Sequence, residues 1–528
     1  MVPYPARVRE RPPSRPWTLA LGAGGGALTW LAFPGTGWWP AAYLGIALLY
    51  LALRRDSARW NAVVGLVFGL ALIGPMITWA DDAVGTVPWL ALTIVESLFI
   101  ALFAAAWSWA RRGEAVWRSP VLQLVVFAAL WVAVEELRSV WPFGGFPWGR
   151  LAFSQADAPM AALMSIGGTP LLSAVVVTTG VALARGLLAV RRVSVGGALG
   201  WTGAAVMLAV IGIVVPLPTA AQSGTLAVGV VQGNVPEPGL GAFDHRRQVL
   251  DNHAAGTHAL LDQVQPGELD LVLWPENGTD IDPQASQEAA SIIDAAARAV
   301  DAPLLVGTVQ YPTAGGRYNT SVLWGPGQGV LASYTKQRPA AFAEYIPIRS
   351  FARHFSSAVD LVTTDMVAGT KPGLIPLESA RLGRTVGIGD VICFEVAYDQ
   401  IVRSAVTSGG EVLVVQTNNA TFGYSDESTQ QLAMVRLRAV EHGRAAVQVS
   451  TVGVSAVIAP NGAVLQQTGL FEAAQMVARL PLRESTTLAT RLGAWPAWII
   501  DALAVCVVVA GAAGAARIRR PQRSETPA

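Results

Sequence analysis

Three side chains with complementary chemistry stand where predicted strands end: the thiol of Cys393, the carboxylate of Glu276 and the amine of Lys336. A thiol with an ordinary pKa of about 8.5 is mostly protonated at neutral pH, so it needs a base or a nearby cation. Glu276 has the chemistry of a base that takes this proton and returns it to a leaving group. Lys336 would favour the thiolate and hold an oxyanion, with the backbone amide of Phe394 as a second donor. We expect the three to converge at one edge of a sheet.

Each of these residues also has an ordinary structural interpretation, as a core cysteine, a loop carboxylate or a surface amine. Two features of the composition favour a catalytic role for Cys393 and Lys336 over these structural roles. The only other cysteine, Cys506, lies in an apolar C-terminal stretch, so Cys393 has no disulfide partner within its own domain. Lysine occurs only at Lys336 and Lys371. Because the chain uses arginine almost everywhere else, a lysine inside a motif favours a specific role for its amine.

Histidine is the rival base, but none of the five histidines stands in a Cys-His signature. His442, near a predicted helix end, is interpreted as a partner of the helix dipole. Two cysteines and scattered histidines also lack the spacing of metal ligands, so no metal or other cofactor is expected.

The overall composition is that of a membrane protein. The chain has 528 residues, 52% of them hydrophobic, and a mean hydropathy of +0.43, which is too apolar for an ordinary soluble protein. Only 14% of residues are charged and the net charge is +1, so nothing indicates nucleic-acid binding. A spanning helix needs about 20 mostly apolar residues. We expect eight, at about 17–33, 38–53, 60–79, 88–110, 119–137, 168–190, 196–217 and 495–515.

Arginines fall into every second connection between these spans. The positive-inside rule then places both termini in the cytoplasm and the domain after the seventh span outside. A cleaved signal peptide is the alternative for the first span, but no clear small-residue cleavage site follows it. The arginines are Arg7, Arg9, Arg11, Arg15, then Arg54, Arg55, Arg59, then Arg111, Arg112, Arg118, then Arg191, Arg192, and finally Arg517, Arg519, Arg520, Arg523.

Between 218 and 494 the pattern changes to that of a water-soluble α/β domain. Short β-rich runs alternate with helical segments, which predicts layers of sheet and helix. Strands are expected from Thr225 and at 269–276, 303–309, 318–325, 329–336, 385–393 and 411–417, a β region at 446–468, and helices at 244–264, 284–300 and 426–443. The stretch 337–380 is long, poorly periodic and rich in aromatic residues. It is either a loop that dips into the lipid surface or ordinary packing against the domain.

Four short motifs of this domain resemble the nitrilase-like carbon–nitrogen hydrolase superfamily. They are Leu273-Trp-Pro-Glu276, Tyr334-Thr-Lys336, Glu344-Tyr-Ile-Pro347 and Ile392-Cys-Phe-Glu395. With seven spans before the domain and one after it, the chain is similar to the apolipoprotein N-acyltransferase family. Further resemblance lies in Glu136-Leu-Arg138 through Trp148, in 416–423 and in 430–444.

The resemblance implies a membrane α-helical bundle of about eight spans plus an extracytoplasmic α/β domain like the nitrilase α-β-β-α sandwich. We expect a tail at 1–16, a seven-helix part at 17–217, a catalytic domain at 218–485, a final transmembrane segment at 486–516 and a tail at 517–528.

The family's Glu–Lys–Cys triad carries over to Glu276, Lys336 and Cys393, and its supporting acids to Glu344 and Glu395. Two positions depart from the family pattern. Phe394 stands where tyrosine is frequent, and Thr421 stands where many relatives have tryptophan. Any role of those two side chains in the family is therefore in doubt here, although the Phe394 amide remains.

The implied reaction is transfer of a fatty acyl chain from a phospholipid, through a Cys393 thioester, to the amine of a lipoprotein's diacylglyceryl-cysteine. The partners would be that phospholipid, the diacylated lipoprotein and the bilayer of the bacterial cytoplasmic membrane. The alternatives are a membrane-tethered amidase or nitrilase that uses water as acceptor, and a catalytically silent lipid-binding scaffold.

Overall fold

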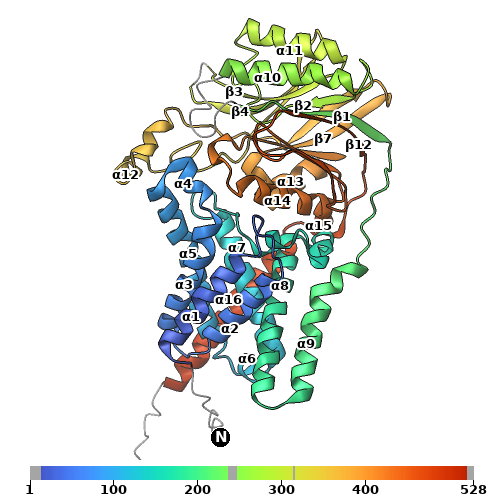
Figure 1. The fold of residues 1–528 in the computed structure, drawn as a ribbon. Helices are drawn as coiled ribbons and strands as arrows, with labels where there is room; N and C mark the ends of the chain where they lie inside the picture. Colours follow the sequence, from blue (N-terminus) through green and yellow to red (C-terminus); the bar gives the residue numbers. More distant parts are fainter. Residues whose placement is uncertain (1–12, 236–245, 313–314, 520–528) are drawn as a thin grey trace, which may run out of the picture.

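A computed structural model of the protein describes residues 13–235, 246–312 and 315–519. A bundle of apolar helices forms one part of the molecule, and an α/β part with two sheets is stacked on one end of it (Figure 1). Arg7, Arg9, Arg11, Arg520 and Arg523, like most of the two expected tails, lie outside the described residues.

The bundle contains a helix at each of the eight places where a span is expected. They are α1 (Arg15–Trp30), α2 (Ala41–Ala52), α3 (Ala58–Met76), α5 (Thr86–Ala110), α7 (Pro120–Val140), α8 (Met164–Arg191), α9 (Val195–Val210) and α16 (Trp495–Arg519). In the described part of the chain, six stretches are long and apolar enough to cross a membrane. Helices α1 and α2 have only 16 and 12 residues, short of the roughly 20 that a span needs. The count of eight spans therefore stays a prediction.

Shorter helices join these segments. They are α4 (Trp79–Val84), α6 (Glu114–Arg118) and the 3-10 turns η1 (Leu151–Gln155), η2 (Pro159–Leu163) and η3 (Ile211–Val214).

The α/β part is a sandwich of two six-stranded sheets. The first sheet runs β12 (Ala474–Pro481), β1 (Thr225–Gln232), β2 (Leu271–Leu273), β3 (Leu304–Gln310), β4 (Tyr318–Gly325), β5 (Gly329–Thr335). The second runs β11 (Val464–Gln467), β10 (Ala456–Ile458), β9 (Ala446–Ser450), β8 (Val412–Thr417), β7 (Arg384–Ile392), β6 (Leu374–Ser379). Buried aliphatic side chains from both, such as Leu273, Ile388 and Val414, form the core between them.

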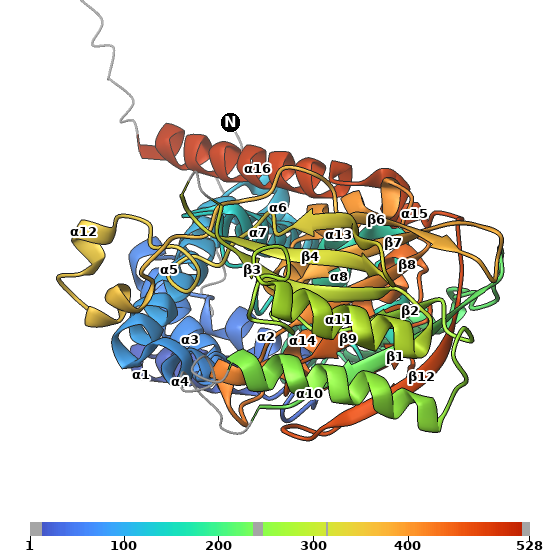
Figure 2. The same cartoon turned by 90° about the horizontal axis from the view of Figure 1, so that it is seen from above.

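Two layers of helices complete the sandwich. Helices α10 (Arg246–Ala259) and α11 (Gln287–Val300) cover the first sheet, on its side away from the bundle (Figures 1 and 2). Helices α13 (Asp399–Thr407) and α14 (Glu427–His442) lie between the second sheet and the bundle. The predicted fold class, a helical membrane bundle with an α-β-β-α domain, is confirmed. Strand β12, strand β6 and helix α13 were not expected; β12 and β6 are edge strands, whose apolar pattern is weaker than that of central strands.

A buried ionic network joins the two parts of the molecule. Arg438 on α14 and Arg150, which follows α7, both bond to Asp399 at the start of α13, at 2.7 and 3.0 Å. Arg150 also pairs with Glu136 of α7, and Thr169 of α8 donates to Asp399 at 3.1 Å. Each guanidinium is at most 2% exposed, so each requires an anionic partner to offset the cost of leaving water.

We predict that Asp399→Ala destabilises the protein far more than Asp360→Ala does. Asp399 pairs with two buried guanidinium groups, and removing one partner of a buried ion pair costs about 3–5 kcal/mol. Asp360 pairs only with Arg353, in a pair more than half exposed on both sides, which contributes about 0–1 kcal/mol. Thermal unfolding of the two variants in one detergent checks this, and equal shifts of the melting temperature would contradict it.

Candidate active site

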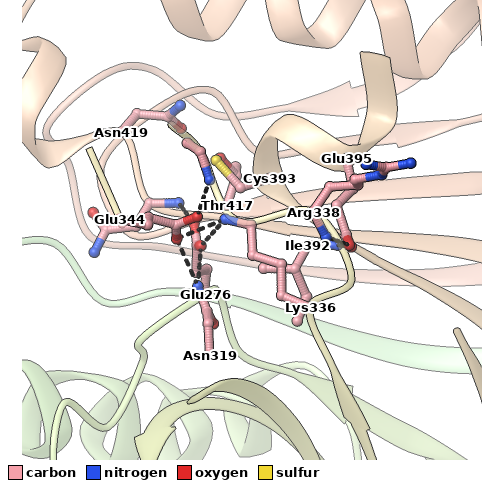
Figure 3. Close-up of polar contacts among 12 residues, drawn as sticks. Glu276, Asn319, Lys336, Arg338, Glu344, Ile392, Cys393, Glu395, Thr417 and Asn419 are labelled. Carbon is pink, nitrogen blue, oxygen red and sulfur yellow. Dashed lines mark hydrogen bonds and ion pairs between the residues drawn. The ribbon is translucent and has the colours of Figure 1, made fainter. Parts of the chain in front are cut away.

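The three residues of the expected triad lie where strands of two different sheets end. Glu276 lies three residues beyond β2 and Lys336 directly after β5, both in the first sheet. Cys393 directly follows β7 of the second sheet and begins the 3-10 turn η7 (Cys393–Ala397). The expectation that they meet at one edge of a single sheet is therefore wrong. They approach one another across the gap between the two sheets (Figure 3).

Lys336 is held between two carboxylates. Its Nζ donates to Oε1 of Glu276 at 3.1 Å and to Oε1 of Glu344 at 2.8 Å. The amide of Asn319 on β4 donates to the same two oxygens, at 2.6 and 3.2 Å. With its side chain 2% exposed, the ammonium has exchanged water for these partners, which keep it charged.

Backbone amides fix the orientation of both carboxylates. The amide of Asn418 donates to Oε2 of Glu276 at 2.9 Å, and that of Ala340 donates to Oε2 of Glu344 at 2.6 Å. Every carboxylate oxygen of the pair therefore has a donor, so neither side chain can rotate without losing hydrogen bonds.

The backbone presents Cys393 in an unusual conformation, with φ at +53°. A non-glycine residue rarely adopts this left-handed region, and such residues are concentrated at functional sites. The hydroxyl of Thr417 and the amide of Gln431 approach Sγ at 3.4 and 3.7 Å. Cys393 thus packs against the core between the sheets while its Sγ contacts polar side chains at the end of β7.

The two key groups perturb each other's protonation. Burial alone would lower the pKa of Lys336, but the carboxylates of Glu276 and Glu344 outweigh it and raise this pKa well above its ordinary value. Burial, followed by the negative charge of Glu276, raises the pKa of the Cys393 thiol, and Lys336 opposes this only in part. The resting thiol is therefore protonated at neutral pH and requires a base at the moment of attack.

Glu395 ties the turn of Cys393 to the strand that carries Lys336. Its Oε1 accepts from the amides of Gln337 and Arg338 at 2.6 and 3.0 Å. Its Oε2 accepts from the Tyr334 hydroxyl at 2.9 Å and from the Ile392 amide at 3.0 Å. One fully buried carboxylate thus fixes the distance between the end of β7, where Cys393 lies, and the end of β5, where Lys336 lies.

Phe394 connects the turn of Cys393 to the helical bundle. Its ring stacks on Trp148 with the centroids 5.6 Å apart and the planes 3° from parallel, and on Phe146 at 5.7 Å. Both partners belong to the segment 141–148 that follows α7. Thr421, the other departure from the family pattern, lies in the 3-10 turn η8 (Ala420–Phe422).

Two buried histidines, His442 and His253, are engaged elsewhere; His245 lies outside the described residues. His442 is the last residue of α14 and contacts the Thr490 hydroxyl at 2.9 Å, while His253 contacts the carbonyl of Val249 at 2.7 Å. Burial lowers the pKa of both. Among the contacts of the described residues, neither imidazole reaches Cys393.

Sequence reasoning missed four of the groups that shape this site: Asn319, the Asn418 amide, Thr417 and Gln431. Thr417, Asn418 and Gln431 lie within the quoted family motifs, but nothing in their spacing revealed a contact with Glu276 or Cys393. The only signal for Asn319 was an amide side chain in the polar first half of β4, before the apolar run that starts at Val322.

Comparison with known proteins decides the family. The family model for the apolipoprotein N-acyltransferase N-terminal domain matches residues 25–182, and that for carbon-nitrogen hydrolase matches 228–489. An apolipoprotein N-acyltransferase of Mycolicibacterium smegmatis is 40% identical over 90% of this chain and 82% of its own length. One from Azotobacter vinelandii is 32% identical over 96% of both chains. The chain belongs to the apolipoprotein N-acyltransferase family. The family predicted from the motifs is confirmed, and with it the acyltransferase class.

Among solved structures, an amidase from Nesterenkonia sp. has a TM-score of 0.38 at 19% identity, covering 52% of this chain and 96% of its own. A mutant of the Nesterenkonia AN1 amidase from the nitrilase superfamily has a TM-score of 0.38 at 19% identity, covering 53% and 98%.

The charges around Cys393 predict opposite effects of two substitutions on its thiol pKa. Glu276→Gln removes a negative charge, so the pKa falls and alkylation begins at a lower pH. Lys336→Met removes a positive charge, so the pKa rises and alkylation begins at a higher pH. The rate of alkylation by iodoacetamide against pH, followed by intact mass in a Cys506→Ser background, measures both shifts.

Shifts in the same direction for both variants would contradict this electrostatic arrangement. An unchanged curve for Glu276→Gln would show that Glu276 carries no charge near the thiol.

Proposed function

We propose that this protein transfers a fatty acyl chain from a phospholipid to the N-terminal amine of a diacylglyceryl-cysteine lipoprotein. Glu276, Lys336 and Cys393 would carry the chemistry in two half-reactions. The observation that carries the proposal is that the turn of Cys393 stacks, through Phe394, on the Trp148 segment next to a membrane helix. A thiol in that position can meet the ester of a lipid without the lipid leaving the bilayer.

In the first half-reaction, Sγ of Cys393 attacks an ester carbonyl of the phospholipid while Glu276 takes the thiol proton. A carbon–sulfur bond forms and the carbon–oxygen bond breaks, and Glu276 returns the proton to the departing lysophospholipid oxygen. Lys336, which stays charged between its two carboxylates, stabilises the oxyanion of the tetrahedral intermediate. The backbone amide of Phe394 is the second donor in this scheme.

In the second half-reaction, the free amine of the lipoprotein attacks the thioester. A carbon–nitrogen bond forms, the carbon–sulfur bond breaks, and the amine proton passes through Glu276 to the thiolate. Glu344 holds Lys336, and Glu395 holds the two strands at a fixed distance, so the same site can serve both steps.

Water must be kept from the thioester, and the surroundings of the site are suited to this. The connection 337–373 between β5 and β6 exposes Phe351, Phe355 and Leu361 at 59–62%, and the segment 141–148 exposes Trp141 and Phe143. The two segments meet where the rings of Phe143 and Phe342 lie 5.8 Å apart. Apolar side chains exposed in this way fit a mouth that lies in the lipid surface.

We further propose the sidedness that the arginines predict, with the α/β part outside the bacterial cytoplasmic membrane and both termini inside. A membrane-tethered amide hydrolase remains the second candidate because it would use the same triad, with water as the acceptor. A silent lipid-binding scaffold is less consistent with a buried Lys336 that two carboxylates hold beside the thiol.

We predict that the detergent-solubilised protein, incubated with phospholipid, gains the mass of one acyl chain in a bond that neutral hydroxylamine cleaves. Cys393→Ala is expected to gain none, whereas Cys506→Ala, which removes the other thiol, is expected to react as the wild type does. Intact mass spectrometry checks all three. An adduct that persists in Cys393→Ala would disprove the proposed nucleophile.

We also expect Lys336→Ala to lose adduct formation by a factor of about 100 to 1,000, the usual cost of removing one oxyanion donor, although its thiol is intact. With a diacylated lipopeptide added, the wild type should give N-acylated peptide. Release of free fatty acid alone would favour the hydrolase.

A further inference from the structure

Arg338 places a positive charge at the rim of the site, on the side that faces the membrane part. Its backbone amide is held by Glu395, and its guanidinium lies over the ring of Tyr398, 5.8 Å from the centroid. The nearest guanidinium nitrogen lies 3.7 Å from the point where a Cβ on Gly144 would stand. Arg338 therefore lies between the turn of Cys393 and the segment 141–148. Figure 3 shows Arg338 beside Glu395.

Two tyrosines hold the segment 141–148 against this region. The Tyr398 hydroxyl donates to the carbonyl of Gly145 at 3.1 Å, and the Tyr345 hydroxyl donates to that of Phe143 at 3.0 Å. The charge of Arg338 lowers the pKa of both phenols, although burial outweighs it and their pKa values are raised. The guanidinium therefore lies close to both hydroxyls, at the junction of the two parts.

This guanidinium has no anionic partner among the described residues. The two carboxylates nearest in the fold are already engaged: all four hydrogen bonds of Glu395 come from Tyr334 and from backbone amides. The carboxylate of Glu344 accepts its hydrogen bonds from Lys336, from the side chain of Asn319 and from the backbone amide of Ala340. By contrast, Arg150 and Arg438 are both paired with the carboxylate of Asp399. A half-buried guanidinium without a carboxylate is a ready site for an external anion.

We propose that Arg338 binds the phosphate of the acyl-donor phospholipid and thereby distinguishes the donor from the acceptor. This inference rests on the proposed function. Donor and acceptor both carry acyl chains on glycerol, but only the donor carries a phosphodiester, joined to its ester groups by the short glycerol backbone. A cation close to the nucleophile, on the side of the membrane surface, recognises the one group that the acceptor lacks. A planar guanidinium matches the geometry of two phosphate oxygens.

The test separates the two half-reactions and compares two donors. One donor is phosphatidylglycerol in detergent micelles, and the other is the p-nitrophenyl ester of the same fatty acid, which has no phosphate. We expect Arg338→Gln to slow acylation of Cys393 by phosphatidylglycerol by roughly 10- to 100-fold, the usual range for a lost charge-assisted hydrogen bond. The effect should fall on KM rather than kcat. Acylation by the p-nitrophenyl ester and discharge by diacylated lipopeptide should be unchanged.

Two further variants serve as controls. Arg338→Lys keeps the charge but loses the fork of donors, so we expect partial recovery with phosphatidylglycerol. Arg298→Gln removes an arginine that is 63% exposed on α11, in the outer helix layer, and should affect neither donor. The unchanged reaction of Arg338→Gln with the p-nitrophenyl ester also shows that this variant is folded.

The outcomes distinguish this inference from the proposed function. If the wild type forms no adduct with either donor, the proposed function fails. If the wild type reacts and Arg338→Gln slows both donors equally, or neither, phosphate recognition by Arg338 is wrong. A slowed discharge with normal acylation would instead assign Arg338 to the acceptor peptide. Inhibition of the wild type by inorganic phosphate that Arg338→Gln abolishes, with no slowing of acylation by phosphatidylglycerol in Arg338→Gln, would show a site for the free ion and not for the lipid.

Discussion

The arrangement of the site depends on one buried charge, the ammonium of Lys336. An amine that is 2% exposed can stay protonated only if anions replace the water it has lost, and Glu276 and Glu344 do so at 3.1 and 2.8 Å. Two carboxylates around one ammonium leave a surplus negative charge in the gap between the sheets. Burial, together with the negative charge of Glu276, raises the pKa of the neighbouring Cys393 thiol and keeps it protonated at rest. In the proposed mechanism the thiol therefore becomes a nucleophile only when Glu276 takes its proton.

The rest of the molecule keeps this cluster in place. Glu395 fixes β7 against the strand end of β5, and the left-handed backbone of Cys393 turns its thiol towards the charges. Helix α14 is buried along nearly all its length because it packs on the second sheet on one side and on helices of the bundle on the other. From it Arg438 bonds the carbonyls of Val396 and Ala397 at 2.9 Å, and so anchors the turn of the nucleophile to the network shared with α7 and α8. The chemistry is thus positioned relative to the membrane by the same contacts that join the two parts.

Much of this could be predicted from the sequence. Long apolar runs and alternating strands and helices predicted the fold class, because hydrophobic periodicity directly reflects burial. Edge strands β6 and β12 were missed, since one exposed face weakens that signal. The sequence did not show that Glu276 and Cys393 come from different sheets, because sheet pairing is set by long-range contacts. Asn319 and Gln431 were missed as site residues for the same reason: their role follows from what lies opposite them in space.

The central claim is that Cys393 carries the acyl chain as a covalent intermediate between two lipids. The most direct measurement is to acylate the protein with a phospholipid bearing an isotope-labelled chain, remove all remaining phospholipid, and then add a diacylated lipopeptide. The account predicts that the label leaves the protein and appears in amide linkage on the peptide amine, in one turnover and with no donor present. Label that stays on the protein, or that reaches the peptide only when fresh phospholipid is supplied, would contradict it.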